Sequence, residues 1–175
     1  MAKRNFKSRR RAFTLVELLI VIIIIGILAG MMMLSAGAAT DKATATRIIS
    51  DTRTMKAAAV MYKADYGSWP LWIYTGDKYV NRDASGDTSV LPGKYFDVDP
   101  VGDGYWIGAM KLPDGGVFAV AEVSNISDAV KKSLEASAES SALYGVAALN
   151  SGGMTTAALK SFKATDKGLV MIISK

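Results

Sequence analysis

One carboxylate, Glu17, stands at the start of an apolar run, residues 18–34, that is long enough to cross a membrane. It is the only charged residue between Arg11 and Asp41. Placing an acid in hydrocarbon costs about 2.5–3.5 kcal/mol on membrane-insertion scales, so an ionisable residue there is expected to have a partner and a function. Because the run contains no cation, we expect the partner of Glu17 to come from outside this segment.

A second reactive group would appear if the chain were cut just before Phe13. The cut would create an α-amino group four residues from Glu17, and a nearby ammonium favours the charged form of a carboxylate. The leader that it removes, residues 1–12, holds six of the 21 Lys and Arg residues and no acid, which leaves 15 basic residues against 16 acidic ones. Basic residues that flank a membrane span stay in the cytoplasm, so the leader predicts topology rather than binding to nucleic acid.

The composition excludes much of enzyme chemistry. The chain has no cysteine and no histidine, which rules out disulfides, the usual zinc sites and serine triads. The carboxylates of Asp97, Asp99 and Asp103 could hold calcium, but their spacing does not match an EF-hand loop. Turn and cap roles are the main interpretation of these aspartates. We therefore predict a protein that is not an enzyme, with no catalytic residue, no cofactor and no metal site.

Residues 13–34 form the element that must position Glu17. The stretch is longer than the apolar core of about 7–15 residues in a cleaved secretory signal, and it reaches the roughly 20 residues that a spanning helix needs. A helix is expected, because it is the one open-chain structure that pairs every backbone group in lipid. Gly26 and Gly30 have the spacing of a helix-contact motif, and two interpretations stay open: a contact between helices or a merely lipid-exposed pair.

The predicted helix continues beyond the apolar segment. One face repeats at alternating steps of four and three residues, which indicates a helix with one sheltered side. The repeating positions are Ile48, Thr52, Met55, Ala59, Tyr62 and Tyr66. Gly67 and then Pro70 predict the end of the helix, as a glycine cap followed by a proline stop.

Residues 11–21, Arg-Ala-Phe-Thr-Leu-Val-Glu-Leu-Leu-Ile-Val, closely resemble the class III leader of type IV pilins and type II secretion pseudopilins. The resemblance is strong over residues 9–36. It implies cleavage by a prepilin peptidase between Ala12 and Phe13, N-methylation of Phe13, and an assembly role for Phe13 and Glu17. The family pattern has glycine where this chain has Ala12; because alanine adds only a methyl group, we expect cleavage to be retained at a lower rate.

The resemblance also implies a route from membrane to filament. Arg9, Arg10 and Arg11 would hold the leader in the cytoplasm while the precursor sits in the inner membrane as a single-pass protein. The implied partners are the prepilin peptidase, the inner-membrane assembly machinery, the membrane itself before assembly, and further copies of the chain in a helical homopolymer. There Glu17 of an incoming subunit can pair with the ammonium of Phe13 on one already assembled, since an orphaned buried charge costs about 3–5 kcal/mol.

The exported part predicts an α+β, pilin-like fold, with a long N-terminal helix packed on a small antiparallel sheet. We divide the chain into a leader (1–12), a transmembrane and assembly helix (13–36), its amphipathic continuation (37–67) and a head domain (68–175). The head is expected to begin with an irregular, aromatic-rich connection over 68–104 that packs on the helix. Strands 105–112 and 117–123 follow around a Pro-Asp-Gly-Gly turn, and then a helix from 128 to about 140, which Asn125 or Ser127 caps and which resumes through 148. A short turn over 155–162 and a buried strand 168–174 complete the head.

Two filament interpretations and one rival follow from the sequence. A structural subunit of a type IV pilus, ending in a cell-surface filament, is the first. A pseudopilin of a type II secretion system, ending in a periplasmic pseudopilus, is the alternative. The rival is a permanently anchored, single-span binding protein that keeps its leader. No nucleic-acid partner is evident, because the exported part has no basic groove lined with aromatic residues.

Overall fold

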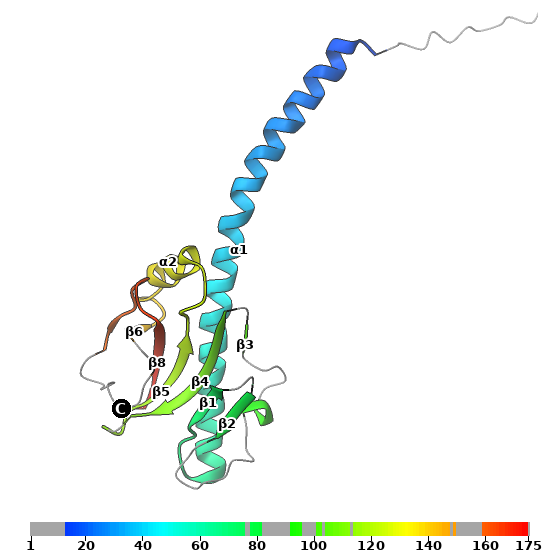
Figure 1. Cartoon of the computed structure of the whole chain (residues 1–175). Helices are drawn as coiled ribbons and strands as arrows, with labels where there is room; N and C mark the ends of the chain where they lie inside the picture. The colour runs from blue at the N-terminus through cyan, green and yellow to red at the C-terminus, as the bar shows by residue number, and fades with distance from the viewer. Residues whose placement is uncertain are drawn as a thin grey trace, which may run out of the picture. The chain divides into compact units, whose positions relative to one another are not determined.

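A computed structural model describes residues 13–75, 78–81, 92–95, 101–102, 104–112, 114–147, 149 and 159–174 (Figure 1). The side chains of Leu34, Ser35 and Thr75 lie outside this description. The chain divides into two compact units, Met1–Ala39 and Thr40–Lys175. The first helix, α1 (Leu15–Tyr66), has 52 residues and contributes to both.

The start and the end of α1 follow from local sequence. The β-branched run at residues 20–25 is a weak helix former in water, but in an apolar solvent the cost of unpaired amides overrides that preference. At the other end Gly67 has φ +73°, a backbone conformation that glycine adopts without steric cost, and its N–H donates to Lys63 O at 2.9 Å. The predicted end of the helix is therefore confirmed.

Within the second unit, the repeating face of α1 is buried. Ile48, Thr52, Met55, Ala59 and Tyr62 are fully buried. Tyr66, the last position of the predicted pattern, differs from the others because 40% of its side chain is exposed.

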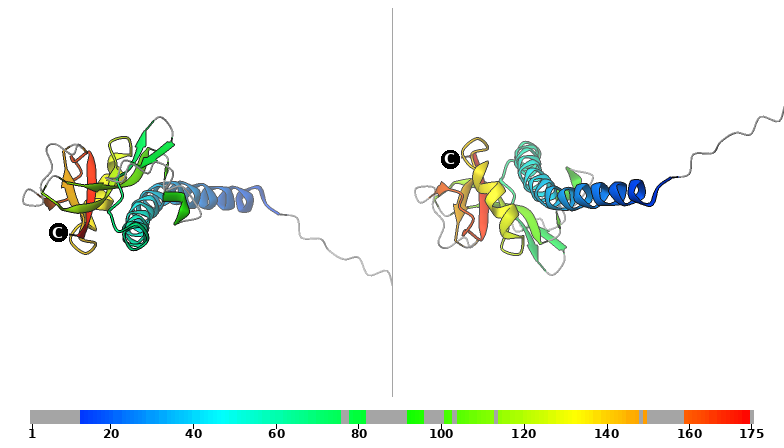
Figure 2. Two further views of the ribbon diagram at one scale, coloured as in Figure 1. Left: turned by 90° about the horizontal axis from the view of Figure 1, so that it is seen from below. Right: turned by 90° about the horizontal axis from the view of Figure 1, so that it is seen from above.

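An antiparallel sheet packs on this face of the helix. Its described strands are β1 (Trp72–Thr75), β2 (Lys78–Asn81), β3 (Val101–Gly102), β4 (Tyr105–Lys111), β5 (Val117–Glu122), β6 (Tyr144–Val146), β7 (Lys160–Ser161) and β8 (Gly168–Ser174). They are ordered β2-β1-β4-β5-β8-β6-β7, and β3 also pairs with β4. A second helix, α2 (Asp128–Ala136), follows β5, and Figure 2 shows it in yellow close to β8 in red.

The strands alternate between two hydrophobic clusters. In β4, β5 and β8, Ile107, Ala119 and Leu169 belong to the core that contains the buried face of α1 together with Val130 and Leu134 of α2. Their neighbours on the opposite face form a second cluster, which contains Met110, Phe118, Val120, Val146 and Val170. This alternation is the period of two that a sheet with both faces covered requires. The predicted α+β, pilin-like architecture is confirmed.

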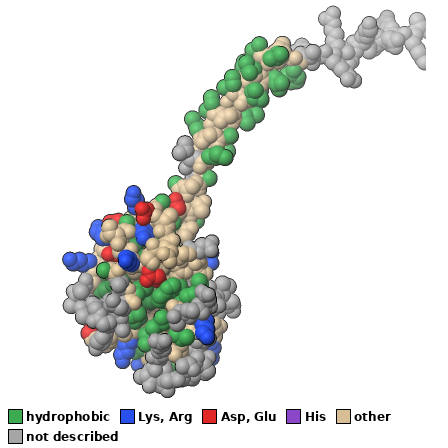
Figure 3. Space-filling view, viewed as in Figure 1, with side chains coloured by type: hydrophobic (Ala, Val, Ile, Leu, Met, Phe, Trp, Pro, Cys, Tyr) green, Lys and Arg blue, Asp and Glu red, His purple; other side chains and the backbone are tan. Residues whose placement is uncertain are grey.

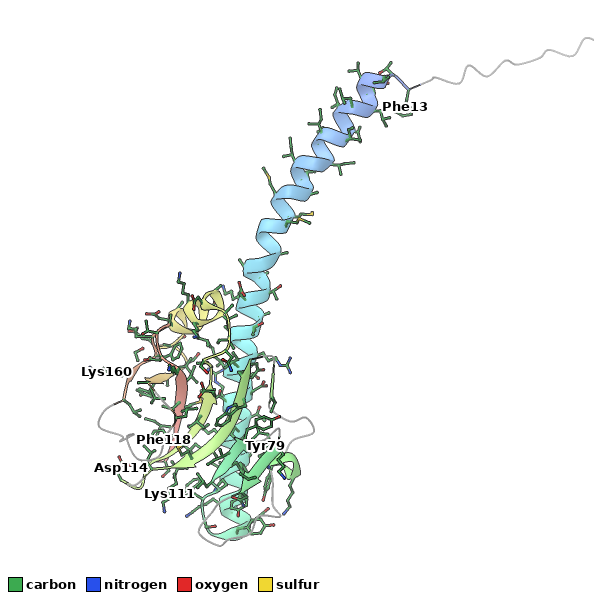
Figure 4. All side chains as sticks on the ribbon, in the orientation of Figure 1. Phe13, Tyr79, Lys111, Asp114, Phe118 and Lys160 are labelled. Carbon is green, nitrogen blue, oxygen red and sulfur yellow. The ribbon has the colours of Figure 1, made fainter. Side chains whose placement is uncertain are left out.

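Three head elements agree with the sequence analysis. β4 and β5 form the predicted hairpin, and Asp114 in its turn accepts a hydrogen bond from Gly116 N at 3.1 Å (Figure 4). Ser127 caps α2 by accepting a bond from Val130 N at 3.3 Å. β8 is the predicted final strand.

Two predictions for the head were wrong. The stretch 68–104 is not an irregular connection throughout, because β1 and β2 pair over four residues each and β3 joins β4. Its expected packing on the helix is confirmed, since Trp72 is fully buried in the core that holds Tyr62. The helix predicted to resume through Ala148 is instead strand β6, which gains backbone hydrogen bonds from β8. The short turn expected over 155–162 overlaps β7, and residues 155–158 lie outside the described residues.

Candidate functional site

A reciprocal pair of hydrogen bonds closes the N-terminal end of α1. Thr14 stands at the cap position, just before the first helical residue, and Glu17 is the third residue of the helix. The carboxylate Oε2 of Glu17 accepts from Thr14 N at 2.8 Å and from Thr14 Oγ1 at 3.0 Å. In return, Glu17 N donates to Thr14 Oγ1 at 3.2 Å. This arrangement is a capping box, which satisfies amide groups that a helix start otherwise leaves unpaired.

The capping box gives Glu17 hydrogen-bond donors within its own segment, whereas the predicted charge partner from outside the segment stays a prediction. The Glu17 carboxylate already has two donors from Thr14 in its own chain. A negative charge in the first helical turn is also favoured by the helix dipole. Thr14 is the functional residue that the sequence analysis missed, although the order Thr-x-x-Glu before an apolar run is a recognised signature of a helix start.

Phe13 lies directly before this cap, at the N-terminal end of α1 (Figure 4). Its side chain is 87% exposed. The other residues assigned to the leader and the cut, Arg9, Arg10, Arg11 and Ala12, lie outside the described residues. The structure therefore brings together Phe13, Thr14 and Glu17 within one helical turn.

The helix that follows the cap is apolar on all sides. Large hydrophobic side chains between Phe13 and Met33 are each at least 48% exposed, and Figure 3 shows them along this part of the helix. By length and composition alone, α1 is the one helix among the described residues that could cross a membrane. Fully burying a Val, Leu, Ile, Phe or Met side chain contributes about 1.5–3 kcal/mol, so this segment requires lipid or other helices around it.

No neighbouring atom within the chain explains why glycine, rather than a larger residue, stands at positions 26 and 30. A Cβ added at Gly26 or Gly30 would meet no atom within 4 Å. Each glycine costs about 1 kcal/mol relative to alanine in a helix. Both interpretations of the pair, helix contact and lipid exposure, therefore remain predictions.

The calcium hypothesis lies beyond what the structure describes. Asp97, Asp99 and Asp103 are all outside the described residues. Within the described ranges, no group of three His, Cys, Asp or Glu side chains is placed to hold a metal ion.

A polar and aromatic cluster ties the C-terminal end of α1 to the head. The hydroxyl of Tyr95 donates to Asp65 Oδ2 at 3.0 Å, and Lys94 Nζ lies 3.9 Å from the same oxygen. Lys94 Nζ is also 5.0 Å from the ring centroid of Tyr66. Burial and the Asp65 carboxylate both raise the pKa of Tyr95 above its ordinary value. These contacts anchor a segment of the head, so we assign the cluster a structural role.

Comparison with known proteins finds relatives that resemble the N-terminal part of the chain. A family model for the prokaryotic N-terminal methylation motif matches residues 7–33. The type II secretion system core protein G of Klebsiella michiganensis is 36% identical over 64 residues, which cover 37% of this chain and 45% of that protein. The protein of the same name from Aeromonas hydrophila is 34% identical over 76 residues, 43% of this chain and 53% of the relative. The N-terminal part of this chain therefore carries a prepilin-type methylation motif and is similar to type II secretion pseudopilins.

These relatives also bear on the choice between the two filament interpretations. A third, core protein G of Escherichia coli K12, is 36% identical over 63 residues, 36% of this chain and 43% of that protein. All three names refer to type II secretion, so they favour the pseudopilin alternative over the type IV pilus that the sequence analysis placed first. The chain spans about half the length of these curated relatives. No solved structure matches it.

Proposed function

We propose that this chain is a pseudopilin of a type II secretion system, made as a membrane-inserted precursor and polymerised through its N-terminal helix. The observation that carries the proposal is a helix exposed and apolar on all sides, with a single carboxylate in its first turn. The methylation motif over residues 7–33 and the names of the relatives support the same proposal.

Processing is the first step. A prepilin peptidase on the cytoplasmic side cuts between Ala12 and Phe13, and the new α-amino group of Phe13 is methylated. The basic residues Arg9, Arg10 and Arg11 leave with the leader, and the membrane segment keeps Glu17 as its one side-chain charge. The helix stays in the inner membrane, because its apolar surface needs lipid on every side.

Assembly exchanges one partner of Glu17 for another. In a single subunit the carboxylate is held by the capping box, and such a cap is worth about 1 kcal/mol. An ammonium 4 Å away, in an effective dielectric constant of about 20, contributes about 4 kcal/mol. The ammonium of Phe13 on a neighbouring subunit therefore outcompetes the Thr14 cap, and it fixes the register of the incoming helix. Neighbouring helices then replace lipid around the apolar segment.

The substitution Glu17→Gln tests this mechanism, because it removes the charge and retains the size and the hydrogen-bonding oxygen. The full chain is expressed with its secretion machinery, the mature N-terminus is identified by mass spectrometry, and polymers are counted by electron microscopy. We expect Glu17→Gln to be processed and inserted but to form few polymers or none. Glu139→Gln, the same change at an exposed head position, is the matched control and should polymerise as the wild type does.

Two results would change the proposal. Normal polymerisation of Glu17→Gln would refute the charge-pair mechanism while leaving the processing step intact. Wild-type polymers found as sheared surface filaments, with no effect of the gene on secretion, would favour the type IV pilus interpretation instead.

A further inference from the structure

Three consecutive methionines close the apolar segment of α1. The side chains of Met31, Met32 and Met33 are 65%, 73% and 85% exposed. The positions from 18 to 28 before them hold only leucine, isoleucine, valine and glycine, whose side chains oxidants do not attack readily. The thioether of methionine, by contrast, is converted to a sulfoxide by common oxidants. The reactive sulfur atoms of the segment therefore lie together at one end of it.

Four other methionines lie among the described residues, and the fold protects three of them. Met55, Met110 and Met171 are at most 6% exposed, within the two hydrophobic clusters of the head. Met61 is 44% exposed on the outer side of α1. An oxidant can react only with a sulfur atom that it can reach, so the accessible sites are the triplet 31–33 and Met61.

The triplet lies where the apolar segment meets water in the proposed topology. Ser35 follows it within two residues, and Asp41 is the next charged residue. Residues 13–30 alone rise about 27 Å as a helix and fall within the range of about 17–25 residues that spans a bilayer. The three thioethers are thus at the exported end of the span, where a peroxide on that side of the membrane reaches them.

The triplet cannot be turned away from a surrounding bundle of helices. Consecutive residues of an α-helix point about 100° apart, so three of them cover an arc of about 200°. In the proposed polymer the apolar segment has neighbouring helices on several sides. At least one of the three thioethers therefore faces a neighbour, whatever the rotation of the helix.

A bundle of these segments offers no donor to an oxidised methionine. A sulfoxide oxygen accepts hydrogen bonds, but the only polar side chains in residues 13–33 are Thr14 and Glu17, at the opposite end. The backbone N–H groups beyond the first turn are already paired within the helix. In the membrane-inserted chain the same sulfoxide can turn toward the headgroups and water, as other polar tips near a span end do. Oxidation therefore disfavours the assembled state more than the inserted state.

We propose that Met31, Met32 and Met33 form an oxidation-sensitive site whose conversion to sulfoxides blocks incorporation of the subunit into the polymer. The oxidant is a peroxide. The thioether sulfur attacks one peroxide oxygen, the O–O bond breaks, an S–O bond forms and the other oxygen leaves as water, so the sulfur loses the two electrons that the peroxide gains. A methionine sulfoxide reductase restores the thioether. This inference rests on the proposed polymerisation and adds a control on it.

A role as apolar filler would also account for methionine, because its side chain is flexible and forms helices well. That role predicts that leucine at positions 31–33 behaves as methionine does, with or without an oxidant. The oxidation-sensitive site predicts a difference that appears only after oxidation. The two interpretations therefore separate when the same variants are compared before and after treatment with peroxide.

The test uses the full chain in cells whose assembly machinery is induced separately. Cells that hold the membrane-inserted chain receive a pulse of hydrogen peroxide, and assembly is then induced. Peptide mass spectrometry measures the sulfoxide at each methionine in the membrane fraction and in isolated polymers. We expect sulfoxides at residues 31–33 to be depleted in polymers by about tenfold or more relative to the membrane fraction, because a buried acceptor without a donor costs at least one factor of ten.

Two variants serve as matched controls. The combined variant Met31→Leu, Met32→Leu and Met33→Leu keeps the apolar volume, removes the three sulfur atoms and should polymerise equally well before and after the pulse. Met61→Leu removes the other accessible sulfur and should lose polymer after the pulse as the wild type does. Electron microscopy counts the polymers of each.

Three results would overturn the inference while the proposed function stands: equal sulfoxide at residues 31–33 in polymers and membranes, oxidation of Met61 without oxidation of the triplet, or an equal loss of polymer in the leucine variant. If the untreated wild-type chain forms no polymer, the proposed function fails, and this inference fails with it.

Discussion

Removing the hydroxyl of Thr14 should open the first turn of α1. Thr14→Val keeps the branched shape but deletes two of the three capping-box hydrogen bonds, those at 3.0 and 3.2 Å, and leaves the 2.8 Å bond from the backbone N–H. Losing an N-cap costs about 1 kcal/mol, which corresponds to a roughly fivefold change in the population of the open turn. Glu17 N also loses its acceptor entirely.

Amide hydrogen exchange on the full chain in detergent measures this effect. In Thr14→Val we expect the amide of Glu17 to lose its protection, and the amide of Leu18, which donates to Thr14 O at 3.3 Å, to exchange about five times faster. Thr46→Val is the matched control on the same helix, because its hydroxyl bonds only to Lys42 O at 2.9 Å. An unchanged Glu17 amide in Thr14→Val would refute the capping box.

Three further predictions concern the head. Ala142 has φ +51°, which costs a non-glycine residue about 1–2 kcal/mol, so Ala142→Gly should raise the midpoint of thermal unfolding by about 2–8 °C. Gly108→Ala should lower it, because the new Cβ would clash with the backbone oxygen of Trp72 and forced overpacking costs about 1–3 kcal/mol. The raised pKa of Tyr95 contributes stability that is fully present below about pH 10 and lost as the pH rises toward the folded-state pKa. Tyr95→Phe should therefore flatten the loss of stability in alkaline denaturation curves, and an unchanged alkaline slope would contradict the Tyr95–Asp65 bond.

The elements predicted correctly are those with a strong local signal. The helix of 52 residues follows from an apolar run joined to a stripe at steps of three and four, and Gly67 ends it. The β4–β5 hairpin follows from alternating apolar residues on both sides of a turn containing proline and glycine. In both cases the local preference and the tertiary contacts favour the same structure, so the element can be predicted from the sequence alone.

The missed elements depend on contacts between residues far apart in the chain. β6 has a sequence that also suits a helix, and it becomes a strand because its backbone pairs with β8, about 24 residues later, with Tyr144 opposite Val170. β1 and β2 are only four residues each, and their aromatic side chains could equally belong to an irregular segment packed on the helix. Short apolar runs of this kind cannot be assigned by periodicity.

The site was predicted in part. The resemblance directed attention to Phe13 and Glu17, and the structure places Glu17 in the first turn of α1 and Phe13 directly before its cap. Thr14 was missed because an opposite charge was expected beside Glu17, whereas backbone and hydroxyl donors can also satisfy a carboxylate. The order Thr-Leu-Val-Glu carried that information.

The identity of the mature N-terminus tests the central claim most directly. We predict that intact mass and terminal-peptide mass spectrometry of the chain from cells with its peptidase will find N-methylated Phe13 as the first residue. A chain that still begins at Met1 in assembled material would contradict the account, because Glu17 would then have no α-ammonium of Phe13 with which to pair.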